Sequence, residues 1–278
     1  MTSVPPPLPS GRWGRLRLGA SMAVRGLTFP LSHSDVFLMC LLVLAVYGAI
    51  WLGLLGLAAR WDQSAVQWLT GDLQDPQGGA WWRGALTAIA RGAAYVLTWA
   101  AAILAASLLA LPLCGPLLSL LADRVEARAA GQTGPLPAWT TLMAEMGRGA
   151  VRSAMLALLL AIGSALIWLV GAAVGALIPP LGGLWALVAG GAWQALGAAS
   201  MTASFALENQ RTPLAEQLAT LQRHRAIWLG FGAVALPLCW LPLGVPFAVT
   251  GATLLVLRLH AAGELRLPAR DGLPRPIF

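Results

Sequence analysis

The most constraining feature of the sequence is a set of long stretches that carry no charge. The longest extends for 55 residues, from Ser153 to Leu207, without one Asp, Glu, Lys or Arg. Three others cover residues 36–59, 92–122 and 226–257. A helix needs about 20 mostly apolar residues to cross a bilayer, so each stretch has the length of at least one span. The stretches predict an all-α integral membrane protein.

Composition supports this class. Of the 278 residues, 58% are hydrophobic and 10% are charged, whereas an ordinary soluble domain carries about 25% charged residues. A soluble fold would lack the polar surface to cover so much apolar material. All 18 basic residues are Arg, and the net charge is +7. The absence of Lys excludes a P-loop of the usual form.

The arginines predict the orientation of the chain in the membrane. They concentrate before residue 30, in the segments 123–152 and 208–225, and in the tail, while the segment 60–82 is richer in Asp. The positive-inside rule then places both termini in the cytoplasm, and the stretches within 153–207 and 226–257 become hairpins that return to the side they left.

This organisation predicts three parts. Residues 1–30 form a cytoplasmic segment, 31–262 a single membrane domain, and 263–278 a disordered cytoplasmic tail. The predicted helices cover about 36–59, 83–129, 138–152, 153–178, 183–207, 213–225, 226–238 and 246–259. Those at 138–152 and 213–225 are amphipathic, which favours packing at the cytoplasmic membrane interface over binding of a partner protein.

The segment PLCWLPLGVP, residues 237–246, interrupts the last uncharged stretch. It leaves 11 apolar residues on each side, and each arm reaches roughly 16 Å against a hydrocarbon core of about 30 Å. We predict a re-entrant hairpin whose tip contains Pro237, Pro242, Gly244 and Pro246. The alternative is a kinked pair of full spans.

The search for reaction chemistry is negative. The three histidines, His33, His224 and His260, lie far apart, and no motif of a hydrolase or metalloprotease is present. The three cysteines, Cys40, Cys114 and Cys239, lie in apolar stretches without metal-binding spacing. No acidic residue lies inside a predicted span. We therefore predict no enzyme, no cofactor and no metal.

Arginines and helix ends are the remaining candidates for function. Arg83 and Arg91 share one helical face where the long second helix begins, and they would attract an anion there. The alternative is that both only extend to the membrane interface. A helix beginning near Pro246 would also direct partial positive charge toward an anion.

Three segments resemble CysZ-type sulfate permeases and the related etoposide-induced protein family. They are LCGPLLSLLADRVEAR at 113–128, FALENQRTPLAEQLATLQRHRAIWLGFG at 205–232 and VPFAVTGATLL at 245–255. The resemblance extends over most of the chain, from about residue 15 to 260. It implies a helical bundle with cytoplasmic termini, two long spanning helices and hairpins that enter only part of the membrane. It also implies sulfate uptake for sulfur assimilation across a bacterial plasma membrane.

One departure from that family concerns the anion site. Such permeases carry a Gly-Leu-Arg element near the first span, whereas here Gly26-Leu27 is followed by Thr28 and preceded by Arg25. The nearby LSHSDVF, residues 31–37, contributes Asp35, whose carboxylate would repel sulfate. The candidate substrate-binding residues are therefore Arg25, Arg83 and Arg91.

Two functions remain open at this point. The first is a permease or channel for a small oxyanion, sulfate by default. The second is a non-transporting scaffold or regulator of the same fold. The expected partners are the lipid bilayer, a small inorganic anion and a second copy of the chain, with no nucleic acid.

Overall fold

The computed structural model describes residues 7–70, 81–131, 139–210, 212–240 and 244–265. Every regular element in this part of the chain is a helix, which confirms the predicted all-α class. The chain divides into two compact units. Unit 1 comprises Met1–Leu44 and Cys114–Phe278, and unit 2 comprises Ala45–Leu113. Two long helices, α2 (Ser34–Thr70) and α3 (Trp81–Ala129), contribute to both units.

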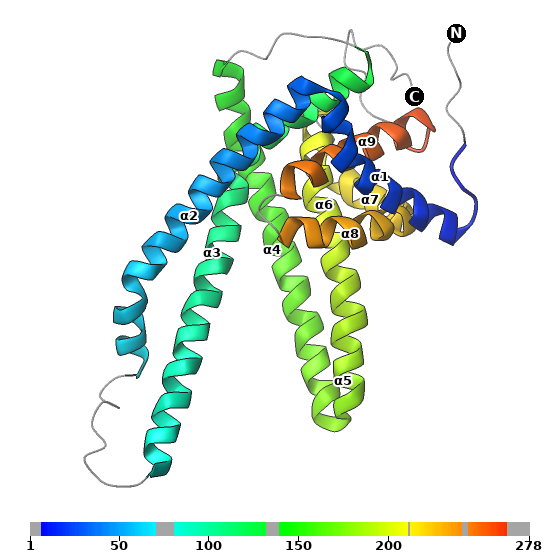
Figure 1. Ribbon diagram of the computed structural model, residues 1–278. Helices are drawn as coiled ribbons and strands as arrows, with labels where there is room; N and C mark the ends of the chain where they lie inside the picture. The colour runs from blue at the N-terminus through cyan, green and yellow to red at the C-terminus, as the bar shows by residue number, and fades with distance from the viewer. Residues whose placement is uncertain (1–6, 71–80, 132–138, 211, 241–243, 266–278) are drawn as a thin grey trace. The chain divides into compact units, whose positions relative to one another are not determined.

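Unit 1 contains the other elements. They are α1 (Arg12–Ser32), α4 (Trp139–Leu177), α5 (Pro179–Trp185), the π-helical segment η1 (Ala186–Gly190), α6 (Gly191–Asn209), α7 (Leu214–Arg223), α8 (Arg225–Trp240) and α9 (Val245–Ala261). Within the unit, α1 and α6 both pack against α8 and α9 (Figure 1). Most side chains of helix α9 are buried.

The first 30 residues, which the sequence analysis left without a helix, contribute most of α1. Its buried positions are Gly19, Met22, Ala23, Gly26 and Pro30. They recur at the spacing of one helical face, but most of them are small. A face built from Gly and Ala contributes little hydrophobicity, which explains why the apolar pattern did not reveal this helix.

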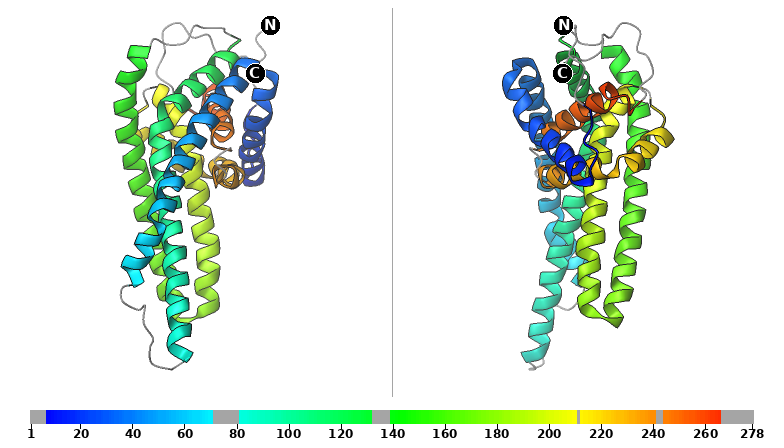
Figure 2. Two further views of the ribbon diagram at one scale, coloured as in Figure 1. Left: turned by 60° about the vertical axis from the view of Figure 1, so that its left-hand side comes forward. Right: turned by 90° about the vertical axis from the view of Figure 1, so that its right-hand side faces the viewer.

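Helices α4 and α6 form the predicted hairpin, and they run side by side in every view (Figures 1 and 2). The reversal occurs at Ile178, whose backbone is extended, and Pro179 then starts α5. Indole groups join the two arms: Trp193 Nε1 donates to the carbonyl of Leu160 at 3.1 Å. The predicted division of 138–178 into two helices is wrong, because α4 is continuous across residue 152.

Two helical segments of the described chain have the length and apolar composition needed to cross a membrane. Ser34–Leu57 has a mean hydropathy of 2.5, and Leu158–Leu177 has 2.3. Large apolar side chains on Leu158–Leu177, such as Leu166, Trp168 and Leu169, are exposed rather than buried in the protein. Such a surface fits lipid and not water, so the structure agrees with an all-α membrane protein.

The last two helices differ in part from the predicted hairpin. Helix α8 continues through Pro237 to Trp240, so Pro237 lies inside a helix and not at the tip. A proline this close to a helix end removes only one backbone hydrogen bond of the last turn. Gly244 precedes α9, Pro246 lies in its first turn, and Pro242 is outside the described residues. The two helices have 16 and 17 residues, fewer than the ~20 that a full span needs.

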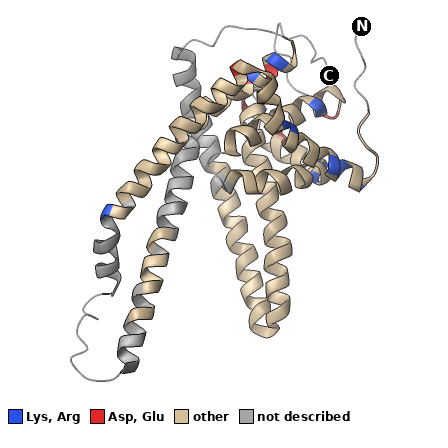
Figure 3. Ribbon diagram, viewed as in Figure 1, with Lys and Arg blue, Asp and Glu red and all other residues tan. Residues whose placement is uncertain are grey.

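Helix α8 runs across the direction of α4 and α6 (Figure 1). Re-entry of the last hairpin into the membrane stays a prediction, as does the single membrane domain of residues 31–262. The charged positions described in unit 1 gather at the end of the unit away from the tip of the α4–α6 hairpin (Figure 3). The hairpin carries no charged residue from Ser153 to Leu207, and the charged residues described in unit 1 lie outside this stretch.

Candidate functional site

The contact of α1 with α8 and α9 positions the first candidate, Arg25. Glycines allow the helix backbones to touch: a Cβ on Gly19 would overlap the carbonyl oxygen of Ile227 in α8. A Cβ on Gly26 would lie 2.7 Å from Cα of Gly251 in α9, which is closer than real side chains come. Arg25 precedes Gly26 directly, so the packing holds its backbone beside α9.

Arg258 is the basic residue that α9 contributes to the same region. It is 8% exposed, which is unusual for a charged side chain. The positive charge of Arg25, which is exposed on α1, acts on Arg258. The two guanidinium groups, which lie near opposite ends of the sequence, therefore interact electrostatically. We call Arg25 and Arg258 the arginine pair.

Of this pair, only Arg25 was predicted from the sequence. Arg258 is the first charged residue after the last uncharged stretch, and it follows the buried Gly251 by seven positions. That spacing places it on the buried face of α9, a signal that was present in the sequence. The side chains of Arg83 and Arg91, both in α3, lie outside the described residues.

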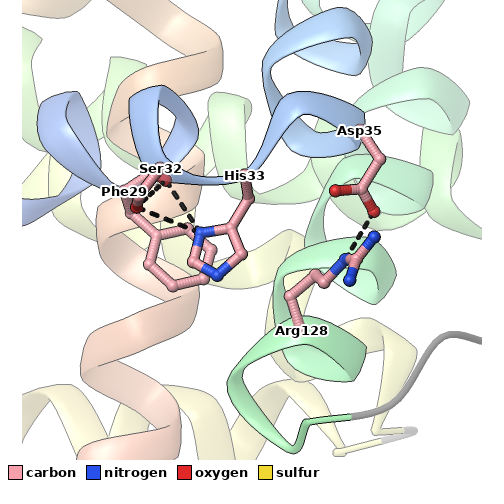
Figure 4. A network of polar contacts seen from close by, with 5 residues as sticks. All are labelled: Phe29, Ser32, His33, Asp35 and Arg128. Carbon is pink, nitrogen blue, oxygen red and sulfur yellow. Dashed lines mark hydrogen bonds and ion pairs between the residues drawn. The ribbon is translucent and has the colours of Figure 1, made fainter.

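The carboxylate of Asp35, expected to repel an anion, has a basic partner. Arg128 Nε, near the end of α3, donates to Asp35 Oδ2 at 2.7 Å, and the two side chains are 32% and 27% exposed. Figure 4 shows this pair beside the junction of α1 and α2, where the ring of His33 stacks on Phe29. The ion pair offsets much of the negative charge, so Asp35 is a weaker obstacle to an anion than the sequence suggested.

A second set of polar contacts joins the end of α3 to the end of α6. Ser119 donates to the side-chain oxygen of Asn209, whose Nδ2 in turn donates to the Ser119 carbonyl at 2.8 Å. About two helical turns further along α3, Glu126 Oε2 accepts a hydrogen bond of 2.7 Å from Nε2 of Gln210, the residue after Asn209, and both residues are buried. Buried polar groups of this kind fix how two helices meet, because each needs its partner.

His224 lies at the turn between α7 and α8, and its side chain is 3% exposed. Its Nε2 is 3.9 Å from Oε2 of Glu264. Burial lowers the pKa of His224 because the imidazolium form would lose its hydration, while Glu264 opposes the shift and Arg15 and Arg223 add to it. Glu264 also lines a neighbouring pocket of about 430 Å³ between α7 and the end of α9.

We expect the free energy of unfolding to fall as the pH drops through the histidine range. In the unfolded chain His224 titrates near about pH 6.5, but in the folded chain its pKa is lower. The contribution is present above the unfolded pKa and is lost as the pH falls through the folded one. Thermal unfolding in detergent, compared at about pH 7.5 and about pH 5.5, measures the change.

Two variants attribute that pH dependence to this residue. His224→Gln should flatten it, because the titrating group is gone. Glu264→Gln should steepen it, because the charge that opposes the shift is gone. An unchanged pH dependence in His224→Gln would show that another group is responsible.

In the described part of the chain, no three His, Cys, Asp or Glu side chains gather into a group that could hold a metal ion. The polar features of unit 1 are instead the arginine pair, the Asp35–Arg128 ion pair and the contacts between α3 and α6. A site with two guanidinium groups has donors and positive charge for an anion.

Comparison with known proteins supplies the family. No curated protein matches the chain. The family model described as sulfate transporter CysZ/etoposide-induced protein 2.4 matches residues 22–249. The match extends from the middle of α1 to the first turn of α9, and so includes Arg25, the α4–α6 hairpin and α8. The chain belongs to the sulfate transporter CysZ/etoposide-induced protein 2.4 family.

Proposed function

We propose that this protein is a permease or channel for a small oxyanion, with sulfate as the substrate that it carries for sulfur assimilation. Family membership supports sulfate transport across a membrane in general terms. The observation that carries the proposal for this chain is the arginine pair, in which the buried Arg258 lies within the field of Arg25.

Like charges that lie close to each other repel. Two guanidinium groups that repel each other are stabilised by an anion that interacts with both. Arg presents several N–H donors in a fixed plane, which suits the oxygens of a tetrahedral oxyanion. The burial of Arg258 strengthens the attraction because the local dielectric is low, while the exposure of Arg25 leaves a route for the ion to reach water.

The route of the anion includes the other candidates as proposals. Arg83 and Arg91, near the start of α3, would attract the ion at the opposite membrane face before it reaches the arginine pair. The same proposal has the chain cross the plasma membrane several times with both termini in the cytoplasm, as the distribution of Arg favours.

The test is sulfate uptake into proteoliposomes that contain the purified full-length protein. Uptake should saturate, exceed that of empty liposomes and be inhibited by other tetrahedral oxyanions but not by chloride. Comparison of Arg91→Ala with the wild type tests whether Arg91 attracts the anion at the outer membrane face. Uptake no faster than in empty liposomes, from protein that melts cooperatively, would favour the non-transporting scaffold instead.

A further inference from the structure

The outward face of α1 has the pattern of a helix that lies on a membrane. Its large exposed apolar side chains are Trp13, Val24 and Leu31, and Trp13 is 84% exposed. The separations of 11 and 7 residues place all three on one side of the helix. The opposite side, with Gly19 and Gly26, is buried against α8 and α9. We call these three residues the α1 apolar stripe.

Basic side chains are exposed on α1 itself and at the turn between α7 and α8. Arg12 and Arg17 are exposed on the first turns of α1, and Arg223 and Arg225 are exposed where α7 ends and α8 begins. We call these four the α1–α8 basic surface. Within the residues that the structure describes, none of the four forms an ion pair. The surface is thus available for anionic groups from outside the protein.

Two contacts bring the halves of this surface together. A Cβ on Gly230 of α8 would overlap the Leu16 carbonyl, so the first turns of α1 touch α8 backbone to backbone. In addition, the charges of Arg15 and Arg223 both act on His224. Two acidic residues, Glu216 and Glu264, lie in the pocket that Arg223 also lines, and they balance part of the charge on that side only.

We propose that the α1–α8 basic surface binds the phosphates of anionic phospholipids, while the α1 apolar stripe enters the boundary between headgroups and acyl chains. An exposed Trp flanked by Arg is typical of side chains at that boundary. Clustered arginines are attracted to anionic lipids, and exposed apolar residues on the same helix add burial that a free phosphate ion would not supply. This pairing favours a lipid over a soluble anion. It also explains why α1 is exposed on one face, although it belongs to the core of unit 1.

The test uses the detergent-solubilised full-length protein and two lipids with the same acyl chains, phosphatidylglycerol and phosphatidylcholine. Phosphatidylglycerol should raise the melting temperature more than phosphatidylcholine, and salt should weaken the difference. The double variants Arg12→Gln/Arg17→Gln and Arg223→Gln/Arg225→Gln should each lose at least about half of that difference. The matched control is Arg60→Gln, an exposed Arg in unit 2, which should respond as the wild type does.

Charge-preserving variants separate binding from damage to the fold. The corresponding Arg→Lys double variants should keep the response to phosphatidylglycerol. Equal responses to the two lipids, or an unchanged response in both Gln double variants, would overturn the proposal. Inorganic phosphate that reproduces the stabilisation would overturn it too, because the surface would then be a site for a free anion.

Discussion

Gly19→Ala is expected to destabilise the protein by about 3 kcal/mol or more, a large part of the ~5–15 kcal/mol that stabilises a typical domain. The added methyl group would overlap the carbonyl oxygen of Ile227 and lie 2.6 Å from the Phe231 nitrogen. Both atoms belong to the backbone of α8, so no side-chain rotation can relieve the clash. The two helices would have to separate. Thermal unfolding in detergent measures the loss.

The reciprocal change tests the same contact from the other helix. Gly230→Ala should destabilise to a similar degree, because its methyl group would overlap the Leu16 carbonyl. Gly48→Ala in α2 is the control, since nothing lies within 4 Å of its added Cβ. There the change should be neutral or stabilising by up to about 1 kcal/mol, as expected for Gly to Ala in a helix. A Gly19→Ala variant that melts like the wild type would contradict the close contact of α1 and α8.

Arg258→Gln is expected to reduce sulfate uptake at low substrate concentration by about ten- to a hundredfold. The substitution removes a buried charge whose hydrogen bonds to an anion would be strong. Arg25→Gln should cost less, roughly two- to fivefold, because exposed charges are screened by water. Initial rates in proteoliposomes, over a range of sulfate concentrations, separate these two effects.

Two control variants separate the effect of the charge from the effect of its position. Arg258→Lys keeps the charge and should recover part of the uptake, while Arg60→Gln, far from the site in sequence and exposed, should leave it unchanged. The melting temperature of each variant shows whether the fold is intact. A folded Arg258→Gln protein with wild-type uptake would remove Arg258 from the anion route.

The sequence was sufficient to predict the fold class. Charged residues are excluded from a helix along the whole length that contacts lipid, and this leaves long uncharged stretches in the sequence. The stretch from Ser153 to Leu207 predicted a membrane hairpin, and the chain turns at Ile178, where the first of its two predicted helices ends. Helix α1 escaped detection because its packing depends on small residues such as Gly19 and Gly26. Close backbone contact stabilises this helix, and hydrophobic periodicity does not report such contact.

Only one residue of the arginine pair, Arg25, could be predicted from the sequence. Arg25 and Arg258 lie near opposite ends of the chain, and no local pattern pairs them. The same holds for Asp35 and Arg128, which are 93 positions apart and whose contact weakens the repulsion first expected of Asp35. Helix α8 also extends two residues beyond its predicted end at 238, because Pro237 near the end of a helix removes only one backbone hydrogen bond.

The packing of α1 on α8 and α9 has a consequence for how the chain is made. Roughly 190 residues separate the end of α1 from the start of α8, so a ribosome adding ~5–20 residues per second needs about 10 to 40 seconds to supply the partner of α1. During that time the glycine face of α1 has nothing to pack against. Completion of the core therefore waits for the last helices to emerge, and a chain that stops before α8 lacks both helices that pack against α1.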